Sequence, residues 1–126
     1  MSLRTPLARA RGLGSAKEGV NHWWMQRITA VALVPLTLWF VIFLLRLVHA
    51  DYFTVVAWIS WPINTVLLVA LLFTTFYHAY LGIQVVIEDY VHAEGVKLAS
   101  LLAVKFLLIL LGGAAILAVL RIAFGG

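Results

Sequence analysis

Three long apolar stretches limit what this chain can fold into, because each is long enough to cross a lipid bilayer. They run from about Ile28 to Val48, from Trp61 to Ile87 and from Leu98 to Ala123. A helix needs about 20 apolar residues to span the hydrocarbon core, and inside lipid it must satisfy its own backbone hydrogen bonds. The stretches are continuous rather than alternating. The sequence therefore predicts an all-α membrane protein with three transmembrane helices.

The composition leaves little for any domain outside the membrane. Hydrophobic residues make up 64% of the 126 residues and charged residues 11%, whereas soluble domains carry about 25% charged residues. We divide the chain into a segment at 1–27 and a three-helix membrane domain at 28–126. The chain contains no cysteine, which excludes disulfides, iron–sulfur clusters and thiolate zinc sites formed by this chain. Any catalytic head must come from another chain.

The positive charge lies mostly before the first apolar stretch, which favours a role in membrane orientation over nucleic-acid binding. Cationic residues beside a transmembrane helix usually mark its cytoplasmic side. The N-terminus is therefore predicted to be cytoplasmic, and the loop at 88–97 should lie on the same side. The cations before the stretch and at its start are Arg4, Arg9, Arg11, Lys17 and Arg27.

His78 lies inside the second apolar stretch, where an ionisable side chain is costly and usually functional. Neutral imidazole is also a common metal ligand. Asp89 follows 11 residues later, and 11 residues turn a helix by about 1,100°, about 20° beyond three full turns. The two side chains therefore share a face, about 16 Å apart along the axis. Gly82 lies on this face and leaves room for a flat macrocycle or another backbone.

A buried metal ligand below a polar pair at the membrane surface looks like a haem beneath a quinone pocket, although the spacing alone does not decide for haem. Tyr90 is placed to donate a hydrogen bond to a quinone carbonyl, and Asp89 to orient Tyr90 or a partner's arginine and to supply protons. Two simpler interpretations stay open: His78 bonds a neighbouring helix, and Asp89 and Tyr90 merely end the helix in water. A six-coordinate haem would need a second axial ligand from another subunit, because the other histidines lie near the membrane surfaces. These are His22, His49 and His92.

The segment from His78 to Tyr90, HAYLGIQVVIEDY, closely resembles the signature of the succinate dehydrogenase hydrophobic membrane anchor subunits. The segment GLGSAKEG at 12–19, followed by HWWMQRITA at 22–30, is similar to the alphaproteobacterial branch of that family. The length and the three helices also match, so the resemblance covers nearly the whole chain. It implies a multi-pass protein of the bacterial inner membrane that forms half of a heterodimeric membrane bundle.

The resemblance also implies cofactors and partners, those of respiratory complex II. His78 would be the axial ligand of the haem b iron, Asp89 and Tyr90 would belong to the ubiquinone site, and Arg27 would lie near the haem propionates. Arg27 has an alternative role as a positive charge that anchors the N-terminus inside. The implied partners are a cytochrome b large membrane subunit that supplies the second haem ligand, an iron–sulfur subunit, and a flavoprotein subunit bound through it.

We therefore expect a membrane anchor that supports electron transfer from the iron–sulfur subunit to ubiquinone and catalyses no reaction alone. Two alternatives remain. The chain is a structural anchor without a redox cofactor, or it is a small transport subunit that uses His78 as a proton relay. These alternatives differ in whether His78 binds a haem.

Several local predictions concern helix geometry. Pro62 should begin the second helix, where its missing N–H costs little, and Pro35 should bend the first. Gly112 and Gly113 should allow close contact between helices. Gln84, which is off the face of His78, should bond another helix. Two tryptophans, Trp58 and Trp61, are expected to form an interfacial belt in a short loop.

Overall fold

Helices make up almost all of the described chain. The computed structural model describes Pro6 and residues 16–125. The helices are α2 (Ala16–Leu47), α3 (Tyr52–Ser60), α4 (Pro62–Tyr90) and α5 (Glu94–Ala123), and no strand occurs among the described residues. Three helices are long and apolar enough to cross a membrane: α2 from Gly19 onward, α4 and α5. The prediction of an all-α membrane protein with three transmembrane helices is confirmed.

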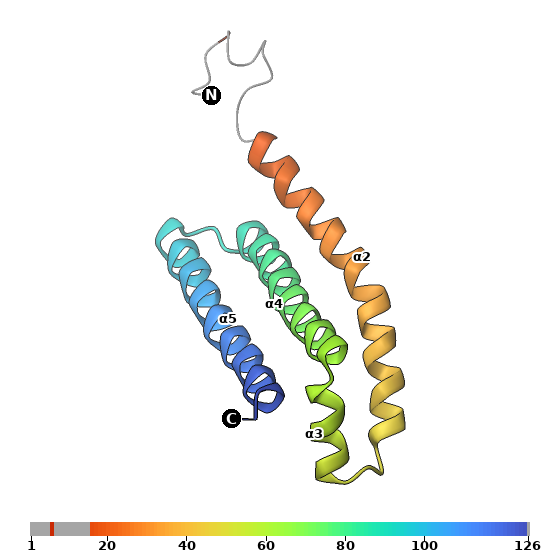
Figure 1. Ribbon diagram of the computed structural model, residues 1–126. Helices are drawn as coiled ribbons and strands as arrows, with labels where there is room; N and C mark the ends of the chain where they lie inside the picture. Colours follow the sequence, from red (N-terminus) through yellow and green to blue (C-terminus); the bar gives the residue numbers. More distant parts are fainter. Residues whose placement is uncertain (1–5, 7–15, 126) are drawn as a thin grey trace.

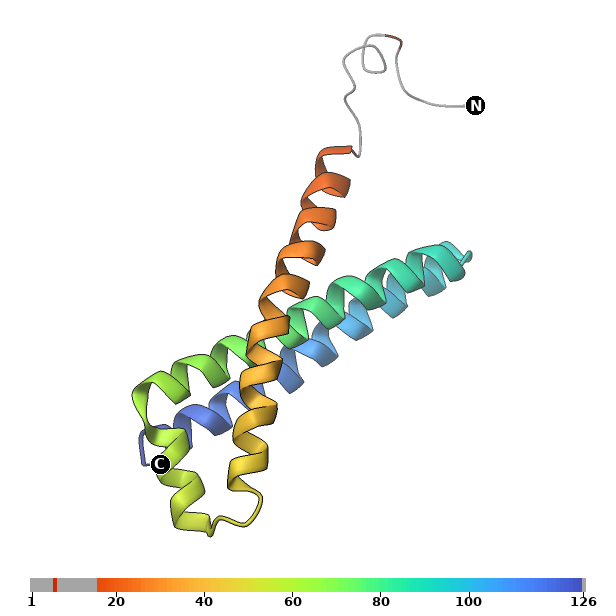
Figure 2. The ribbon, with the colours of Figure 1, turned by 90° about the vertical axis from the view of Figure 1, so that its right-hand side faces the viewer.

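The central helix of the arrangement is α4, which packs against both α2 and α5 (Figure 1). The two helices α4 and α5 run antiparallel and stay side by side along their length. In contrast, α2 crosses α4 at a large angle, and its N-terminal half diverges from the C-terminal end of α4 (Figure 2). Contact between α2 and α4 is therefore concentrated around their crossing, which is where the candidate site lies.

The first long helix begins well before the predicted position. It starts at Ala16 rather than near Ile28 and continues through Pro35 to Leu47. Apolar residues mark only the part of a helix that lies in lipid, whereas hydrogen bonding can continue into the polar residues beside the membrane. Of the cations used to predict orientation, Arg4, Arg9 and Arg11 lie outside the described residues, as does the side chain of Lys17.

The loop expected after the first span contains a helix of nine residues, α3. Asp51 caps its N-terminus, because the carboxylate accepts a hydrogen bond from the backbone N–H of Thr54 at 3.2 Å. Trp58 does not simply form a belt. Its ring stacks on Trp39 of α2, with centroids 5.6 Å apart, and contacts Phe43 at 4.8 Å. These aromatic contacts hold α3 against the end of α2.

The junction between α3 and α4 is held by side-chain hydrogen bonds. Pro62 is the first residue of α4, as predicted. The Asn64 amide donates to the Trp58 carbonyl at 2.8 Å, and the Thr65 hydroxyl donates to the Ile59 carbonyl at 2.6 Å. Both polar side chains are buried. They help to satisfy the carbonyls at the end of α3, of which that of Trp58 also accepts from the Trp61 N–H at 3.3 Å.

Close approach of α4 and α5 depends on one of the two adjacent glycines. A Cβ atom placed on Gly112 would lie 3.1 Å from Cγ of Phe76, whereas one on Gly113 would meet nothing within 4 Å. The prediction of close contact is confirmed for Gly112, whereas Gly113 meets no described part of this chain. The difference arises because the two residues point about 100° apart around the helix.

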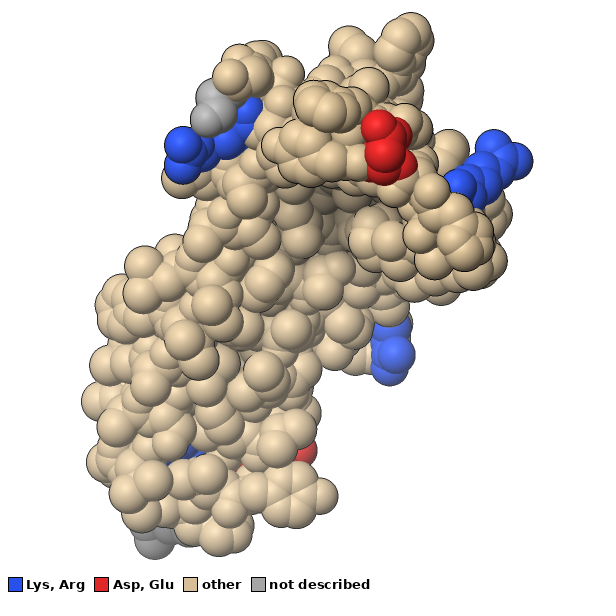
Figure 3. All heavy atoms as spheres, turned by 90° about the horizontal axis from the view of Figure 1, so that it is seen from below, with Lys and Arg blue, Asp and Glu red and all other residues tan. Residues whose placement is uncertain are grey.

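The surface of the chain is mostly apolar. Seen from the end that carries α3, few charged side chains interrupt it (Figure 3). The buried apolar core is small: Leu68, Leu71, Leu81 and Ile87. Lipid accepts apolar side chains as readily as a protein core does, so spanning helices need small residues and hydrogen bonds at their contacts. Polar contacts between helices are therefore informative in this chain.

Candidate functional site

His78 lies in the middle of α4, at its crossing with α2. Its Nδ1 atom is 2.8 Å from the Thr29 hydroxyl oxygen of α2. The simpler interpretation, that the imidazole bonds a neighbouring helix, is thus correct for Nδ1. No described residue forms a hydrogen bond with Nε2. One ring nitrogen is engaged with α2, and the other remains available to a ligand.

Thr29 is one of the least exposed residues of the described chain, at 6% relative exposure. Its hydroxyl oxygen also lies 2.7 Å from the Met25 carbonyl and 3.0 Å from the Gln26 carbonyl. Bonds of this kind, to carbonyls three or four residues earlier, are common for threonine inside helices. The hydroxyl therefore connects the imidazole of α4 with the backbone of α2.

Gly82 lies opposite α2 one turn after His78. A Cβ atom on Gly82 would be 3.8 Å from the side-chain nitrogen of Gln26. The side chain of Gln26 on α2 thus lies beside Gly82 at an ordinary van der Waals distance. Room for a flat macrocycle at this point stays a prediction.

Two further polar side chains on α2 were not singled out from the sequence as part of this site. Gln26 Oε1 and His22 Nε2 are buried, and neither has a hydrogen-bond partner among the described residues. With Thr29 they follow one another at intervals of four and three residues, so they line one face of the helix. A buried unsatisfied polar group costs about 1–3 kcal/mol. That periodic spacing, which leads into the first apolar stretch, was the available sequence signal.

Asp89 and Tyr90 form the end of α4 and are exposed, with Tyr90 at 78% relative exposure. No side-chain hydrogen bond joins them to each other or to another residue of the described chain. Asp89 shares the face of His78 about 16 Å further along the axis, whereas Tyr90 is turned about 120° from that face. The structure places both residues at the exposed C-terminal end of α4 and does not bring them to the histidine.

Arg27 lies near the crossing but on a different side of α2. Its guanidinium carbon is 5.3 Å from the centre of the Trp23 ring, a cation–π contact one turn away. Arg27 precedes Thr29 by two residues, which corresponds to about 200° around the helix and about 3 Å along it. The structure therefore places Arg27 near the level of His78 and does not direct it toward the imidazole.

The remaining polar predictions have local outcomes. Gln84 donates to Glu88 on its own helix at 3.1 Å, so the prediction that it bonds another helix is wrong. Four residues separate the two side chains, which makes them neighbours on one helical face. No group of three or more potential metal-ligating side chains occurs in the part of the chain that the structure describes. His78 stands apart from the other histidines.

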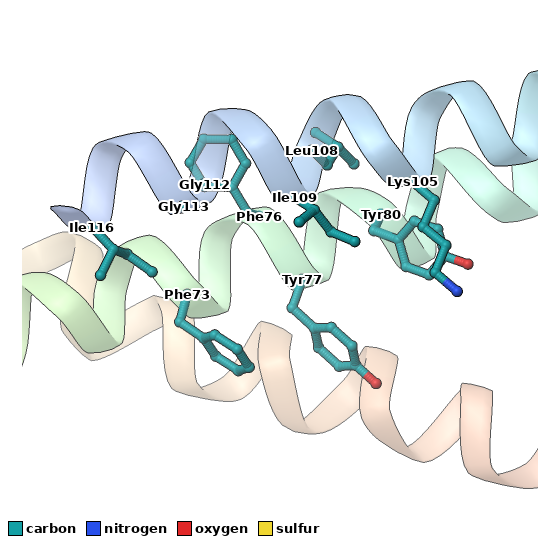
Figure 4. Close-up of a pocket in the computed structure, with 10 residues that line it drawn as sticks. All are labelled: Phe73, Phe76, Tyr77, Tyr80, Lys105, Leu108, Ile109, Gly112, Gly113 and Ile116. Atoms are coloured by element: carbon teal, nitrogen blue, oxygen red, sulfur yellow. The ribbon is translucent and has the colours of Figure 1, made fainter.

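A separate apolar cavity lies between α4 and α5 (Figure 4). Its volume is about 330 Å³, and its walls are mostly aromatic and aliphatic. Tyr80 and Lys105 lie close together at one end of it. None of the residues predicted for the haem or quinone site lines this cavity. The candidate site is therefore the α2–α4 crossing together with the exposed end of α4.

The comparisons with known proteins agree on one family. Residues 1–112 match the model of the succinate dehydrogenase/fumarate reductase transmembrane subunit. The chain is 40% identical over 107 residues to the succinate dehydrogenase hydrophobic membrane anchor subunit of Rickettsia bellii (strain RML369-C), covering 85% of this chain and 86% of that protein.

Two more distant relatives agree. The subunit of the same name from Paracoccus denitrificans is 31% identical over 102 residues, covering 81% of this chain and 79% of that protein. The succinate dehydrogenase membrane anchor subunit of Porphyra purpurea is 35% identical over 108 residues, covering 86% and 88%. No solved structure matches the chain. With its three membrane-spanning helices, the chain belongs to the succinate dehydrogenase/fumarate reductase transmembrane subunit family, as a membrane anchor subunit of succinate dehydrogenase.

Proposed function

We propose that this anchor supplies one axial ligand to a haem b and part of a ubiquinone site. In this role it supports electron transfer from an iron–sulfur subunit to ubiquinone. The observation that carries the proposal is the state of His78: a mid-helix imidazole whose Nδ1 is bonded and whose Nε2 has no partner among the described residues. Neutral imidazole with one free nitrogen is the usual form of a histidine ligand.

The residues around the crossing fit a haem shared with another chain. His78 offers one donor atom, and the buried, unpaired atoms of His22 and Gln26 mark a polar face of α2 that this chain does not complete. A bound haem would supply a one-electron carrier at this level of the membrane. The other three histidines are not at the level of His78, so a second axial ligand would come from a large cytochrome b subunit.

Asp89 and Tyr90 are proposed to serve the quinone. Both are exposed at the end of α4, where the membrane meets water. The Tyr90 hydroxyl can donate a hydrogen bond to a quinone carbonyl, and the Asp89 carboxylate can exchange protons with water. Their lack of partners within the described chain leaves both groups available for these roles.

Arg27 is proposed as a partner of the haem propionates. It lies about 3 Å along α2 from Thr29, and its side chain is exposed. A charge at that depth in lipid needs an opposite charge or a polar cavity, and a propionate would supply the charge. The Trp23 contact holds the guanidinium at the surface of α2. The same charge would also favour a cytoplasmic N-terminus in the bacterial inner membrane.

The proposed partners follow from these roles. The flavoprotein and iron–sulfur subunits would form the head outside the membrane, since this chain contains no cysteine for an iron–sulfur cluster. The large membrane subunit would cover the polar face of α2. The chain alone would catalyse no reaction.

Replacement of His78 by leucine in the assembled complex tests the central proposal. His49→Leu is the matched control, because His49 is exposed beyond the end of α2. We expect His78→Leu to lose haem or to change its absorption spectrum, while His49→Leu keeps the normal spectrum. An unchanged spectrum in assembled His78→Leu complex would contradict haem ligation and favour a purely structural anchor. Proton flux through this chain in liposomes without its partners would favour the transport alternative.

A further inference from the structure

We propose that Thr29 positions His78 and selects the ring tautomer in which Nε2 carries the free lone pair. The inference rests on the proposed haem role of His78 and adds to it a residue that would not touch the haem. Its basis is the contact between Thr29 Oγ1 and His78 Nδ1, at 2.8 Å, which joins two helices through residues 49 positions apart in sequence. This bond lies at the α2–α4 crossing.

The proton arrangement follows from the three neighbours of the Thr29 hydroxyl oxygen. Two are carbonyl oxygens, of Met25 at 2.7 Å and Gln26 at 3.0 Å, and carbonyls can only accept. The third is the imidazole Nδ1, which can donate or accept depending on its proton. A hydroxyl has one proton, and the two carbonyls can be satisfied only if it points to them rather than to Nδ1. The hydroxyl oxygen then accepts a hydrogen bond from Nδ1–H.

This arrangement decides which nitrogen is free. A neutral imidazole carries one proton, so protonated Nδ1 leaves Nε2 with an available lone pair. No described residue occupies Nε2. Histidines that bind metals usually donate their other N–H to an acceptor, which fixes the ring and makes it a more basic ligand. Thr29 would be that acceptor, supported in turn by the carbonyl of Met25.

The location of Thr29 strengthens the assignment. The residue is 6% exposed, so neither water nor lipid headgroups compete for its hydroxyl. The Gln26 side chain of α2 also reaches α4 at this level, where its nitrogen would lie 3.8 Å from a Cβ atom on Gly82. A threonine that only bonds its own helix would satisfy its hydroxyl without any histidine. A threonine that only bonds its own helix and a threonine that orients His78 therefore predict different effects of its substitution on a bound haem.

The test uses the purified four-subunit complex with three variants of this chain. Thr29→Val removes the hydroxyl and keeps the branched shape, and Thr29→Ser keeps the hydroxyl. Thr37→Val is the control, since Thr37 is an exposed threonine on the same helix. Haem affinity is measured by transfer of haem to an excess of apomyoglobin, and the haem reduction potential is measured by optical redox titration.

We expect Thr29→Val to weaken haem binding by about 10- to 100-fold, as loss of such a supporting bond typically does. Its reduction potential should move upward, because a less basic imidazole stabilises the oxidised iron less. Thr29→Ser and Thr37→Val should match the unaltered complex in both measurements. A purely structural threonine would change assembly or thermal stability but not the potential of the assembled complex.

An assembled Thr29→Val complex with unchanged haem affinity and potential would overturn the inference. Should that variant fail to assemble, Thr29→Cys gives a second measurement, because a thiol is a weaker acceptor of similar size. Its potential should then lie above that of Thr29→Ser, and equality would overturn the inference. Failure of the haem proposal itself is distinguished by His78→Leu, which would then retain the normal haem spectrum.

Discussion

Gly112 of α5 faces the ring of Phe76 on α4 so closely that a Cβ atom there would lie 3.1 Å from the ring carbon Cγ. The neighbouring Gly113 meets nothing within 4 Å. Two adjacent glycines of one helix therefore serve different purposes, and only the first sets the distance between α4 and α5. This pair allows a matched comparison.

Gly112→Ala should destabilise the packing of α4 and α5 by about 1–3 kcal/mol, the usual effect of overpacking a close contact. Gly113→Ala should be neutral or stabilise the helix by up to about 1 kcal/mol, because alanine has less backbone freedom to lose than glycine. Thermal unfolding of the purified complex in detergent measures both effects. Equal stabilities of the two variants would show that the approach to Phe76 is not limiting.

Tyr90→Phe should weaken quinone reduction without affecting assembly. The change removes one hydroxyl at the exposed end of α4. Loss of one neutral hydrogen bond amounts to about 0.5–1.5 kcal/mol, so the KM for a soluble ubiquinone should rise by about 2- to 12-fold. Tyr52→Phe is the control, since Tyr52 is an exposed tyrosine at the start of α3. An unchanged KM in Tyr90→Phe would rule out a direct bond to the quinone.

Asp89→Asn should alter the pH dependence of quinone reduction more than the affinity for quinone. The amide cannot carry a proton to the quinone, although it can still hydrogen bond. Glu88→Gln is the matched control, because Glu88 is the adjacent exposed carboxylate and bonds Gln84 instead. Rates measured across pH for both variants separate the two carboxylates. Identical profiles would assign proton delivery to another group.

Asp51 makes the N-terminus of α3 sensitive to acid. Hydrogen bonds from the Thr54 hydroxyl, and then from its backbone N–H, hold the pKa of Asp51 below its usual value of 3.8. Because the pKa is lower in the folded state, the cap is fully effective above the pKa of the unfolded state. Its contribution is lost as pH falls through the pKa of the folded state. We expect the first turn of α3 to open in this acidic range.

Hydrogen exchange of the α3 amides, corrected for intrinsic rates, measures this opening. Protection in the unaltered chain should decrease below about pH 4. Asp51→Asn should retain a cap, because asparagine is also a good N-cap residue, but it should lose the pH dependence. The same acid response in both proteins would mean that another group controls the helix.

The membrane fold could be predicted because its cause is local. Each span depends on the hydrophobicity of its own residues, and Pro62 begins α4 because a helix start tolerates the missing N–H. Helix α3 is different, since nine residues are too few to span a membrane or to form a stable helix alone. It depends on contacts between Trp58 and the rings of α2. The sequence indicated α3 only through a capping pair, Asp51 and the donor Thr54.

The candidate site was predicted in part. His78 could be found because a histidine is rare at that depth. Thr29 was missed because a threonine inside a membrane helix usually bonds its own backbone, and its approach to His78 depends on how α2 crosses α4. The bond from Gln84 to Glu88 shows the opposite error, since a neighbour on the same helix was overlooked in favour of a distant one. The roles of Asp89, Tyr90 and Arg27 remain predictions.

The divergence of α2 from α4 matters most before the subunit assembles with its partners. The N-terminal half of α2 leaves α4 (Figure 2), and the side chains of Trp23 and Trp24 there are about half exposed in a single copy of the chain. Such a copy leaves this face of its first helix exposed. Its abundance should therefore follow the supply of the subunit that covers this face.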